Sequence, residues 1–437
     1  MLTTLRNAFK IKEIRQKLIF TLVMLVVIRI GSQLPVPGVD RTYFAQWFAA
    51  QTGGAFSFFD AITGGSFLSM SILALNISPY ITSSIIMQLL TIAIPKLEEM
   101  QREGEDGRKK IVAITRYVTI VLALIQSSAM AIGFGRQGYL VEYNALNVIT
   151  AIVALTAGSA FLMWVGEQIT EHGVGNGISI VLVINIISRL PNDIRGLFDQ
   201  FVFGKAPATA ILAAVIIFAI IIAMVVLVII LNAGTRKIPV QYAKKVQGRK
   251  MVGGQTSNIP LKVNTSGVIP IIFAQSIMQL PIMISSFAGY SGTGVWNEIL
   301  LGLNSNNWCN PSRPIYSIGL LVYVVLVIFF AYFYTSITFN PLMVADNMKK
   351  QGGFIPGIRP GKPTSDYLNK VLNYIVFIGA VGLIIVAVLP YVFNGVFGAS
   401  VSFGGTSLII IVSVVLETLK QVESQMLVRN YKGFLDD

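Results

Sequence analysis

Long apolar stretches recur along the chain, separated by segments that hold nearly all of its charged residues. A helix needs about 20 apolar residues to cross the hydrocarbon core of a bilayer. A chain in lipid must also satisfy its backbone groups within each spanning segment. The pattern therefore predicts an all-α, multi-spanning membrane protein with ten transmembrane helices, at residues 18–37, 70–94, 114–134, 146–166, 177–191, 208–232, 267–287, 315–336, 371–391 and 404–420.

The basic residues between these spans are distributed unequally. If both termini lie on the inner side, the inner segments and the adjoining Lys420 hold 26 of the 33 lysine and arginine residues. An excess of lysine and arginine marks the cytoplasmic side of a membrane protein. The sequence therefore predicts that both termini and two large basic loops, residues 233–266 and 337–370, face the cytoplasm.

The composition agrees with this class of protein. Only 12% of the residues are charged and the mean hydropathy is +0.71, whereas a soluble domain carries about twice that charge. A single cysteine, Cys309, excludes an internal disulfide. Residues 1–17 place Leu2, Leu5 and Phe9 at helical spacing among basic residues, which favours an amphipathic helix on the cytoplasmic membrane surface over an ordinary basic flank.

The segment before the second span has a different character. Residues 53–69 are apolar but rich in glycine, and they include Asp60. Such a segment does not cross a membrane alone. Irregular backbone at membrane depth needs protein or water around it, so we expect a short helix that is tucked back into the protein.

Spans two and seven resemble one another. Ile77–Leu90 (ISPYITSSIIMQLL) and Val268–Pro281 (VIPIIFAQSIMQLP) match at six of fourteen positions without gaps. Because the predicted topology gives these spans opposite directions, the match predicts two inverted five-helix halves. Such repeats place the functional path at the interface of the halves, near the midplane of the membrane.

Both repeats carry a proline, Pro79 or Pro270, and several polar side chains. We expect each proline to break or bend its helix. The polar side chains either join helices to one another or face a water-filled path, and the sequence does not decide between these uses. They are Ser78, Thr82, Ser83, Ser84 and Gln88 in one repeat, and Gln275, Ser276 and Gln279 in the other.

The spans contain little that supports coupled transport or catalysis. Arg29 is the one ionisable residue that we expect inside a span, and it can extend toward the outer surface. Ion-coupled transporters place carboxylates or histidines in the membrane, but the only histidine, His172, lies in a predicted inner loop. No nucleotide-binding motif, metal-ligand cluster or catalytic triad is recognisable. We expect neither an enzyme nor a bound cofactor.

The two long inner loops carry further information. Loops of more than 30 residues are uncommon without a function. Residues 236–250 are basic and contain no acidic side chain, and residues 349–363 are basic and contain three prolines. Basic loops of this length suit an acidic partner, including the phosphates of RNA.

Several motifs make the chain resemble the SecY family of bacterial protein-conducting channels, and the resemblance covers nearly the whole sequence. The motifs are VIRIG and PVPG (within 27–38), ITGGSFLSMSILALNISPYITSSIIMQLL (62–90), EGEDGRKKI (103–111), ITEHGVGNGISI (169–180), YAKKVQGRK (242–250), PLKVNTSGVIP (260–270), FIPGIRPGKPT (354–364) and FGGTSLII (403–410).

The resemblance implies ten helices in two halves around a central pore, which a plug closes and which opens sideways between spans two and seven. By matching positions it assigns four groups of residues. The pore ring is Ile77, Ile81, Ile186, Ile272 and Ile410. The plug is residues 56–69, with Phe59, Asp60, Ile62, Gly64 and Gly65. The lateral gate is Thr82, Gln88, Gln275 and Leu280. The docking residues are Arg249, Lys250 and Arg359.

The implied organisation is a cytoplasmic segment 1–17, a first half 18–205, a second half 206–420 and a cytoplasmic tail 421–437. The implied partners are SecE-like and SecG-like membrane subunits, the SecA motor ATPase, the ribosome, secretory and membrane-protein substrates, and the lipid of the bacterial cytoplasmic membrane. The favoured function is a protein translocase channel without catalysis. The alternative is a secondary transporter of a small neutral solute. A channel for unfolded chains has to pass every sequence, and an apolar constriction suits that requirement.

Overall fold

The structure is a computed structural model. It describes residues 9–40, 43–44, 46, 60, 63–136, 138, 140–203, 207–242, 245–247, 250–252, 256–287, 294–397 and 405–432. The predicted plug residues Phe59 and Ile62 and the predicted docking residue Arg249 lie outside these ranges.

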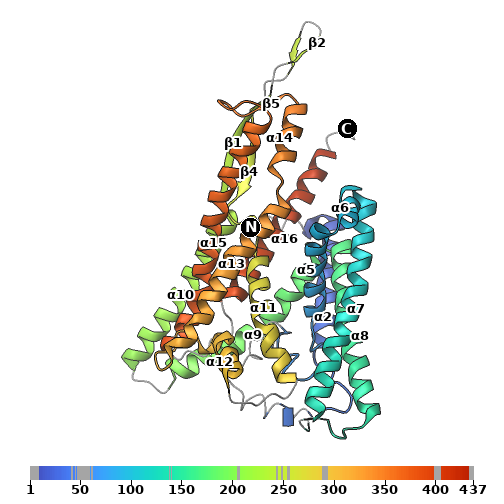
Figure 1. Ribbon diagram of the computed structural model, residues 1–437, viewed down its shortest axis with the longest axis vertical. Helices are drawn as coiled ribbons and strands as arrows, with labels where there is room; N and C mark the ends of the chain where they lie inside the picture. Colours follow the sequence, from blue (N-terminus) through green and yellow to red (C-terminus); the bar gives the residue numbers. More distant parts are fainter. Residues whose placement is uncertain are drawn as a thin grey trace.

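Helices dominate the described chain, and each of the ten predicted spans coincides with one of them (Figure 1). The helices of the first half are α2 (Lys12–Gly31), α5 (Ser78–Ala93), α6 (Pro95–Arg102), α7 (Glu105–Arg136), α8 (Ala145–His172) and α9 (Gly177–Phe201). Those of the second half are α10 (Pro207–Ala233), α11 (Ile269–Phe287), α12 (Val295–Leu303), α13 (Ile318–Thr338), α14 (Pro341–Lys350), α15 (Lys362–Phe397) and α16 (Gly405–Lys432). Two short 3-10 helices, Ser305–Asn307 and Pro314–Ser317, follow α12.

Six helical segments of the described chain are long and apolar enough to cross a membrane, and a seventh span results if α5 and α6 are counted as one bent segment. The axes of α5 and α6 differ by 105° at the break before Pro95. The apolar part of α11, Ile269–Ile282, is shorter than a bilayer requires by itself. The chain is thus a multi-pass α-helical protein, and the count of ten spans stays a prediction.

The second span begins later than the sequence predicts. Residues 64–77 form successive turns, and helix α5 begins only at Ser78. Met70 and Asn76 have positive φ angles of 41° and 52°, which a helix does not accommodate. The apolar character of 70–77 therefore reflects burial within the protein and not a membrane-spanning helix. The fifth span differs in the other direction, because α9 continues through Pro191 to Phe201.

The prolines of the two repeats do not bend their helices; of the two outcomes that we expected, the structure shows a break, with each proline at a helix start. Pro79 lies in the first turn of α5, and Pro270 is the second residue of α11. The first turn of a helix accepts proline because its backbone N–H groups have no partner inside the helix. Each proline therefore marks where a helix starts, and the repeated motif places both starts next to a non-helical segment.

The two long basic loops form one structural unit. Strand β1 (Thr235–Tyr242) pairs in antiparallel register with β4 (Thr256–Lys262) on one side and with β5 (Gly353–Phe354) on the other. Strands β2 (Lys245–Gln247) and β3 (Lys250–Val252) form the tip of the hairpin. This sheet joins the first loop to the second, so both lie at the same end of the molecule (Figure 1). The sequence analysis did not predict these strands.

A small apolar core explains why the loops fold together. Ile238 and Val240 of β1 pack with Leu261 of β4 and with Ile355 and Leu368 from the second loop and α15. All five side chains are at least 96% buried. Because burial of apolar area stabilises such a unit, the two loops fold together around β1, β4 and β5 into one unit, here called the loop platform.

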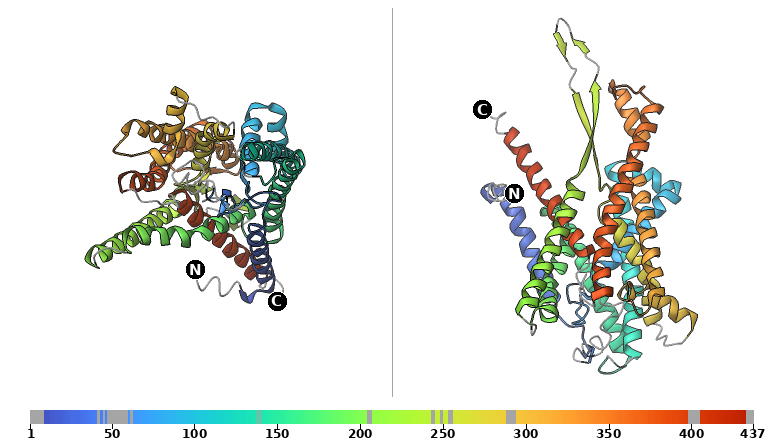
Figure 2. Two further views of the ribbon diagram at one scale, coloured as in Figure 1. Left: turned by 90° about the horizontal axis from the view of Figure 1, so that it is seen from below. Right: turned by 90° about the vertical axis from the view of Figure 1, so that its left-hand side faces the viewer.

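The helices form two groups with α9 between them. Helices α2, α5, α7 and α8 lie on one side, and α10, α11, α13 and α15 lie on the other (Figure 1). The view along the long axis shows the same separation, with the oblique helix α16 crossing toward α2 (Figure 2). Each group has its own apolar core, one centred on Leu155 of α8 and one on Val327 of α13. A third cluster lies between the groups and is described below.

The first testable prediction concerns this arrangement. Cysteines placed singly at Ser257 and Gln351, both exposed on the loop platform, should react with a membrane-impermeant thiol reagent from one side of the membrane. A cysteine at the exposed Ser312, near α12 at the opposite end, should react from the other side. Labelling of intact cells and of inverted vesicles measures this.

The background for that experiment should lack Cys309. Burial raises the pKa of the Cys309 thiol, which lowers the thiolate fraction but does not abolish its reactivity. Labelling of positions 257 and 312 from the same side would contradict the topology.

Candidate pore and gate

The five isoleucines assigned to the pore ring meet in one apolar cluster between the two helix groups, here called the central cluster. Ile77 caps the start of α5, Ile186 lies on α9 and Ile410 lies on α16. These three are at least 96% buried. Ile81 of α5 and Ile272 of α11 are half-buried and pack against them. Residues separated by more than 300 positions in the chain are thus neighbours.

The central cluster continues into both helix groups through Ile28 of α2, Leu162 and Val165 of α8, and Val414 of α16. Its branched apolar side chains offer water no hydrogen bonds, so water and ions are excluded from the space that they fill. The cluster therefore has the chemistry of a seal and contains no group that catalyses a reaction.

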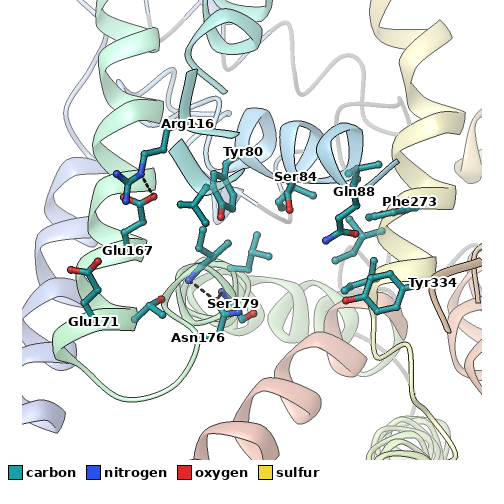
Figure 3. A pocket seen from close by; sticks show the side chains of 18 residues that line it. Tyr80, Ser84, Gln88, Arg116, Glu167, Glu171, Asn176, Ser179, Phe273 and Tyr334 are labelled. Atoms are coloured by element: carbon teal, nitrogen blue, oxygen red, sulfur yellow. Dashed lines mark hydrogen bonds and ion pairs between the residues drawn. The ribbon is translucent and has the colours of Figure 1, made fainter. Parts of the chain in front are cut away.

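A cavity of about 480 Å³ borders the central cluster. Its walls come from α5, α7, α8, α9 and α11, with Tyr334 contributed by α13 (Figure 3). Ile81 and Ile272 line the cavity and also belong to the packing of the central cluster. The cavity thus ends on the central cluster, at the place where the two repeated helices α5 and α11 begin.

The cavity is polar on the side of α5 and α8. Ser84 and Gln88 of α5 line it, together with Glu167 and Thr170 of α8 (Figure 3). Arg116 Nε of α7 donates to Glu167 Oε1 at 2.7 Å. This ion pair neutralises both side chains beside a partly enclosed space. The sequence analysis missed it, because the two residues are 51 positions apart.

The repeated polar side chains serve both of the uses that the sequence left open. Ser83 is buried and its Oγ donates to the carbonyl of Thr115 at 2.8 Å, so it joins α5 to α7. Ser84 and Gln88 face the cavity instead. Adjacent positions on one helix point in different directions, and only packing decides which of them meets a neighbour.

The four residues assigned to the lateral gate lie in different environments. Gln88 lines the cavity, and its Oε1 atom has no hydrogen-bond partner among the described residues. Thr82 donates to the carbonyl of Ser78 in its own helix at 3.0 Å. Gln275 is buried and accepts a hydrogen bond of 3.4 Å from the hydroxyl of Tyr391 on α15. Leu280 is 46% exposed.

The part of the predicted plug that the structure describes is enclosed by protein. Asp60 is completely buried and forms an ion pair with Arg189 of α9. Gly64 and Gly65 follow in tight turns with φ angles of 66° and 85°. Further along, Ser159 of α8 donates to the carbonyl of Asn76 at 3.1 Å. We expected a short helix tucked back into the protein; residues 64–70 lie against the protein but form turns and not a helix.

The ion pair corrects one expectation. We expected Arg29 to be the one ionisable residue within a span, but Arg189 lies inside α9 with 19% of its side chain exposed. Asp60 stands alone in an apolar stretch, whereas Arg189 has Asp193 four residues further along the chain. Buried charges require partners, so the lone Asp60 signals that a basic partner exists, but the sequence does not say which one.

The two assigned docking residues that the structure describes, Lys250 and Arg359, lie on the loop platform. Lys250 is in β3 at the tip of the hairpin. Arg359 is exposed in the loop between β5 and α15, where its carbonyl accepts a hydrogen bond of 2.8 Å from Thr364 Oγ1. The structure thus presents both at the same end of the molecule. No group of histidine, cysteine, aspartate and glutamate in the described ranges has the arrangement of a metal site.

Comparison with known proteins agrees with this geometry. Residues 71–419 match the family model described as SecY. The chain belongs to the SecY family. It is 43% identical to the protein translocase subunit SecY of Streptomyces galbus and 43% identical to that of Bacillus subtilis, in both cases over 100% of this chain and of the relative.

Solved structures share the fold. The structure described as that of a protein conducting channel has a TM-score of 0.63 at 18% identity, and the match covers 94% of this chain and 92% of that one. Sec61 in a canine ribosome–channel complex has a TM-score of 0.61 at 17% identity, with 94% and 92% covered. The chain is therefore a channel subunit of a protein translocase and not an enzyme. These comparisons give no support to a solute transporter.

The second testable prediction concerns contact across the halves. Cysteines replacing Ile81 and Ile272, in a background without Cys309, should be joined by a short bifunctional thiol reagent, because both side chains border one cavity and pack on one cluster. A protease site introduced after Phe203 separates the halves, so cross-linked halves migrate together on a denaturing gel. The pair Ile81→Cys and Ile217→Cys should not cross-link, because Ile217 packs in the core of the second half. Equal cross-linking of both pairs would contradict the placement.

Proposed function

We propose that the chain conducts unfolded polypeptides across the membrane along a path that begins at the 480 Å³ cavity and is closed by the central cluster. One observation carries this proposal: the cavity ends on Ile81 and Ile272, which pack with the three buried ring isoleucines. Apolar side chains exclude ions at rest and move aside for a peptide without recognising its sequence.

The same path opens sideways in this proposal. Helices α5 and α11 both line the cavity, and they belong to the two repeated halves 18–205 and 206–420. Separation of these two helices exposes the path to lipid, so apolar segments of membrane proteins leave it laterally. The assigned gate residues Thr82, Gln88, Gln275 and Leu280 lie on these helices.

We further propose that the protein resides in the bacterial cytoplasmic membrane, with both termini and the loop platform in the cytoplasm. The concentration of basic residues at these segments supports the orientation. SecE-like and SecG-like subunits then contact its membrane face. The SecA motor or the ribosome binds the platform, where Lys250 and Arg359 provide positive charge for acidic side chains or RNA phosphates. Sec61, a neighbour in fold, is described in complex with a ribosome.

The third testable prediction concerns the seal. Ile272→Asn or Ile410→Asn gives water and polar peptide groups a hydrogen-bonding partner within the central cluster, so each should lower the free energy of opening by roughly 1–3 kcal/mol. We expect higher ion conductance across planar bilayers and export of a precursor with a defective signal sequence.

Ile217→Asn is the matched control, because Ile217 lies on α10 and packs outside the central cluster. It should not increase conductance, although it can lower stability. Assembled ring variants that neither conduct ions nor export the defective precursor would remove these isoleucines from the seal.

The fourth testable prediction concerns docking. Arg359→Glu should strongly reduce translocation driven by the SecA motor while the channel still assembles, because it replaces a forked hydrogen-bond donor with a charge that repels an acidic partner. Precursor import into proteoliposomes measures this. Lys362→Glu, an equal charge change at a neighbouring exposed position, should have a smaller effect. Normal import by the Arg359 variant would exclude Arg359 from the docking surface.

A further inference from the structure

One face of α9 holds the segment between Asp60 and Asn76 at three points. Asn185 Nδ2 donates to Asn76 Oδ1 at 3.1 Å, and Ser188 Oγ lies 3.4 Å from the carbonyl oxygen of Gly64. Arg189 forms the ion pair with Asp60. The three α9 residues are spaced i, i+3 and i+4, which places them on the same side of a helix.

The backbone of the segment fits closely against this face. A Cβ atom added to Gly64 would lie 2.4 Å from the carbonyl oxygen of Asn185, which is shorter than any normal contact. Gly64 also has a φ of 66°, a conformation that favours glycine. Only a glycine at this position lets the segment approach α9 this closely. The close contact is therefore a specific feature of the fold.

Asp60 uses its two carboxylate oxygens for different purposes. Oδ1 accepts a hydrogen bond of 2.8 Å from the backbone N–H of Leu68, which closes the loop from 60 to 68 on itself. The carboxylate also faces Arg189. The side chain is completely buried, and a buried carboxylate without a counter-charge is strongly unfavourable. The loop is therefore stable in this position only while Arg189 is opposite to it.

Arg189 has a second acidic neighbour, which makes the arrangement reversible. Its Nε atom lies 3.6 Å from Asp193 Oδ1, one turn further along α9. If the segment leaves, Asp60 moves with it toward water, and Arg189 keeps Asp193 as its partner. Without Asp193, departure of the segment would leave a buried arginine unpaired, which is a large penalty.

We infer that Asp60 and Arg189 form a latch that positions Asp60 and residues 63–77 on α9 while the path is closed, and that opening transfers Arg189 from Asp60 to Asp193. The inference rests on the proposed closure of the path by the central cluster. Ile186, a ring residue, directly follows Asn185 on the same helix, so movement of α9 acts on the seal and on the latch together. Arg189 is a positioning residue, because it acts through the segment that it holds.

The test uses ion conductance of the assembled channel in planar bilayers, in the absence of a precursor. Arg189→Gln should raise the resting conductance at least about tenfold, because the buried Asp60 loses its counter-charge. Arg189→Lys keeps the charge and should restore most of the seal. Asp60→Asn should also raise the conductance, and it carries the test if Arg189→Gln does not assemble, because asparagine retains an acceptor for the N–H of Leu68.

The double variant identifies the contact. Two residues that act through one interaction show effects that are not additive, so Asp60→Asn with Arg189→Gln should conduct no more than the leakier single variant. Arg195→Gln is the matched control, since Arg195 is exposed on the same helix, and its conductance should equal that of the parent. Additive effects in the double variant, or an equal leak from Arg195→Gln, would overturn the latch.

Ile410→Asn separates this inference from the proposal on which it rests. If Ile410→Asn leaks while Arg189→Gln and Asp60→Asn are as tight as the parent, the apolar seal stands and the latch is wrong. If none of the three leaks although each assembles, the seal itself is wrong.

Discussion

Inside a bilayer no water is present to satisfy a polar group, and this constraint governs the non-helical and polar features that lie between the spanning helices. The turns between residues 64 and 77 exist at depth only because α8 and α9 supply partners for them, such as Ser159 for the carbonyl of Asn76 and Asn185 for its side chain. The same constraint explains why Asp60 occurs with Arg189 and why Ser83 bonds to the backbone of α7.

The constraint also explains how one structure combines a tight seal with a path. A seal made of polar contacts would admit water and would prefer particular substrates. In the proposed channel the central cluster instead closes the path with branched apolar side chains, which interact with no sequence in particular. The polar contacts lie apart from the central cluster, on the face of α9 that holds Asp60 and residues 63–77. Helix α9 contributes to both, because Ile186 belongs to the cluster while Asn185, Ser188 and Arg189 make the polar contacts.

The two long basic loops follow a different physical rule, because they lie outside the spanning segments. Their lysine and arginine residues agree with the predicted orientation of the spans. Charge alone, however, would not fold these loops. Ile238, Val240 and Ile355 remove apolar area from water where β1, β4 and β5 meet. The two loops therefore become one platform, which holds Arg359 in a fixed relation to the hairpin.

The sequence by itself determined the class of protein, the segments that become helices and the asymmetry of charge, because hydropathy and lysine and arginine content act locally along the chain. The repeated motif also indicated that Ile81 and Ile272 occupy equivalent places. The tertiary structure alone decided where α5 begins, since the apolar character of residues 70–77 is the same for a buried turn and for a membrane helix. It also decided the pairing of Asp60 with Arg189, of Arg116 with Glu167, and of β1 with β5. These partners are far apart in the chain. Local sequence preferences do not specify which distant group will pair with a buried charge or with an unpaired strand edge.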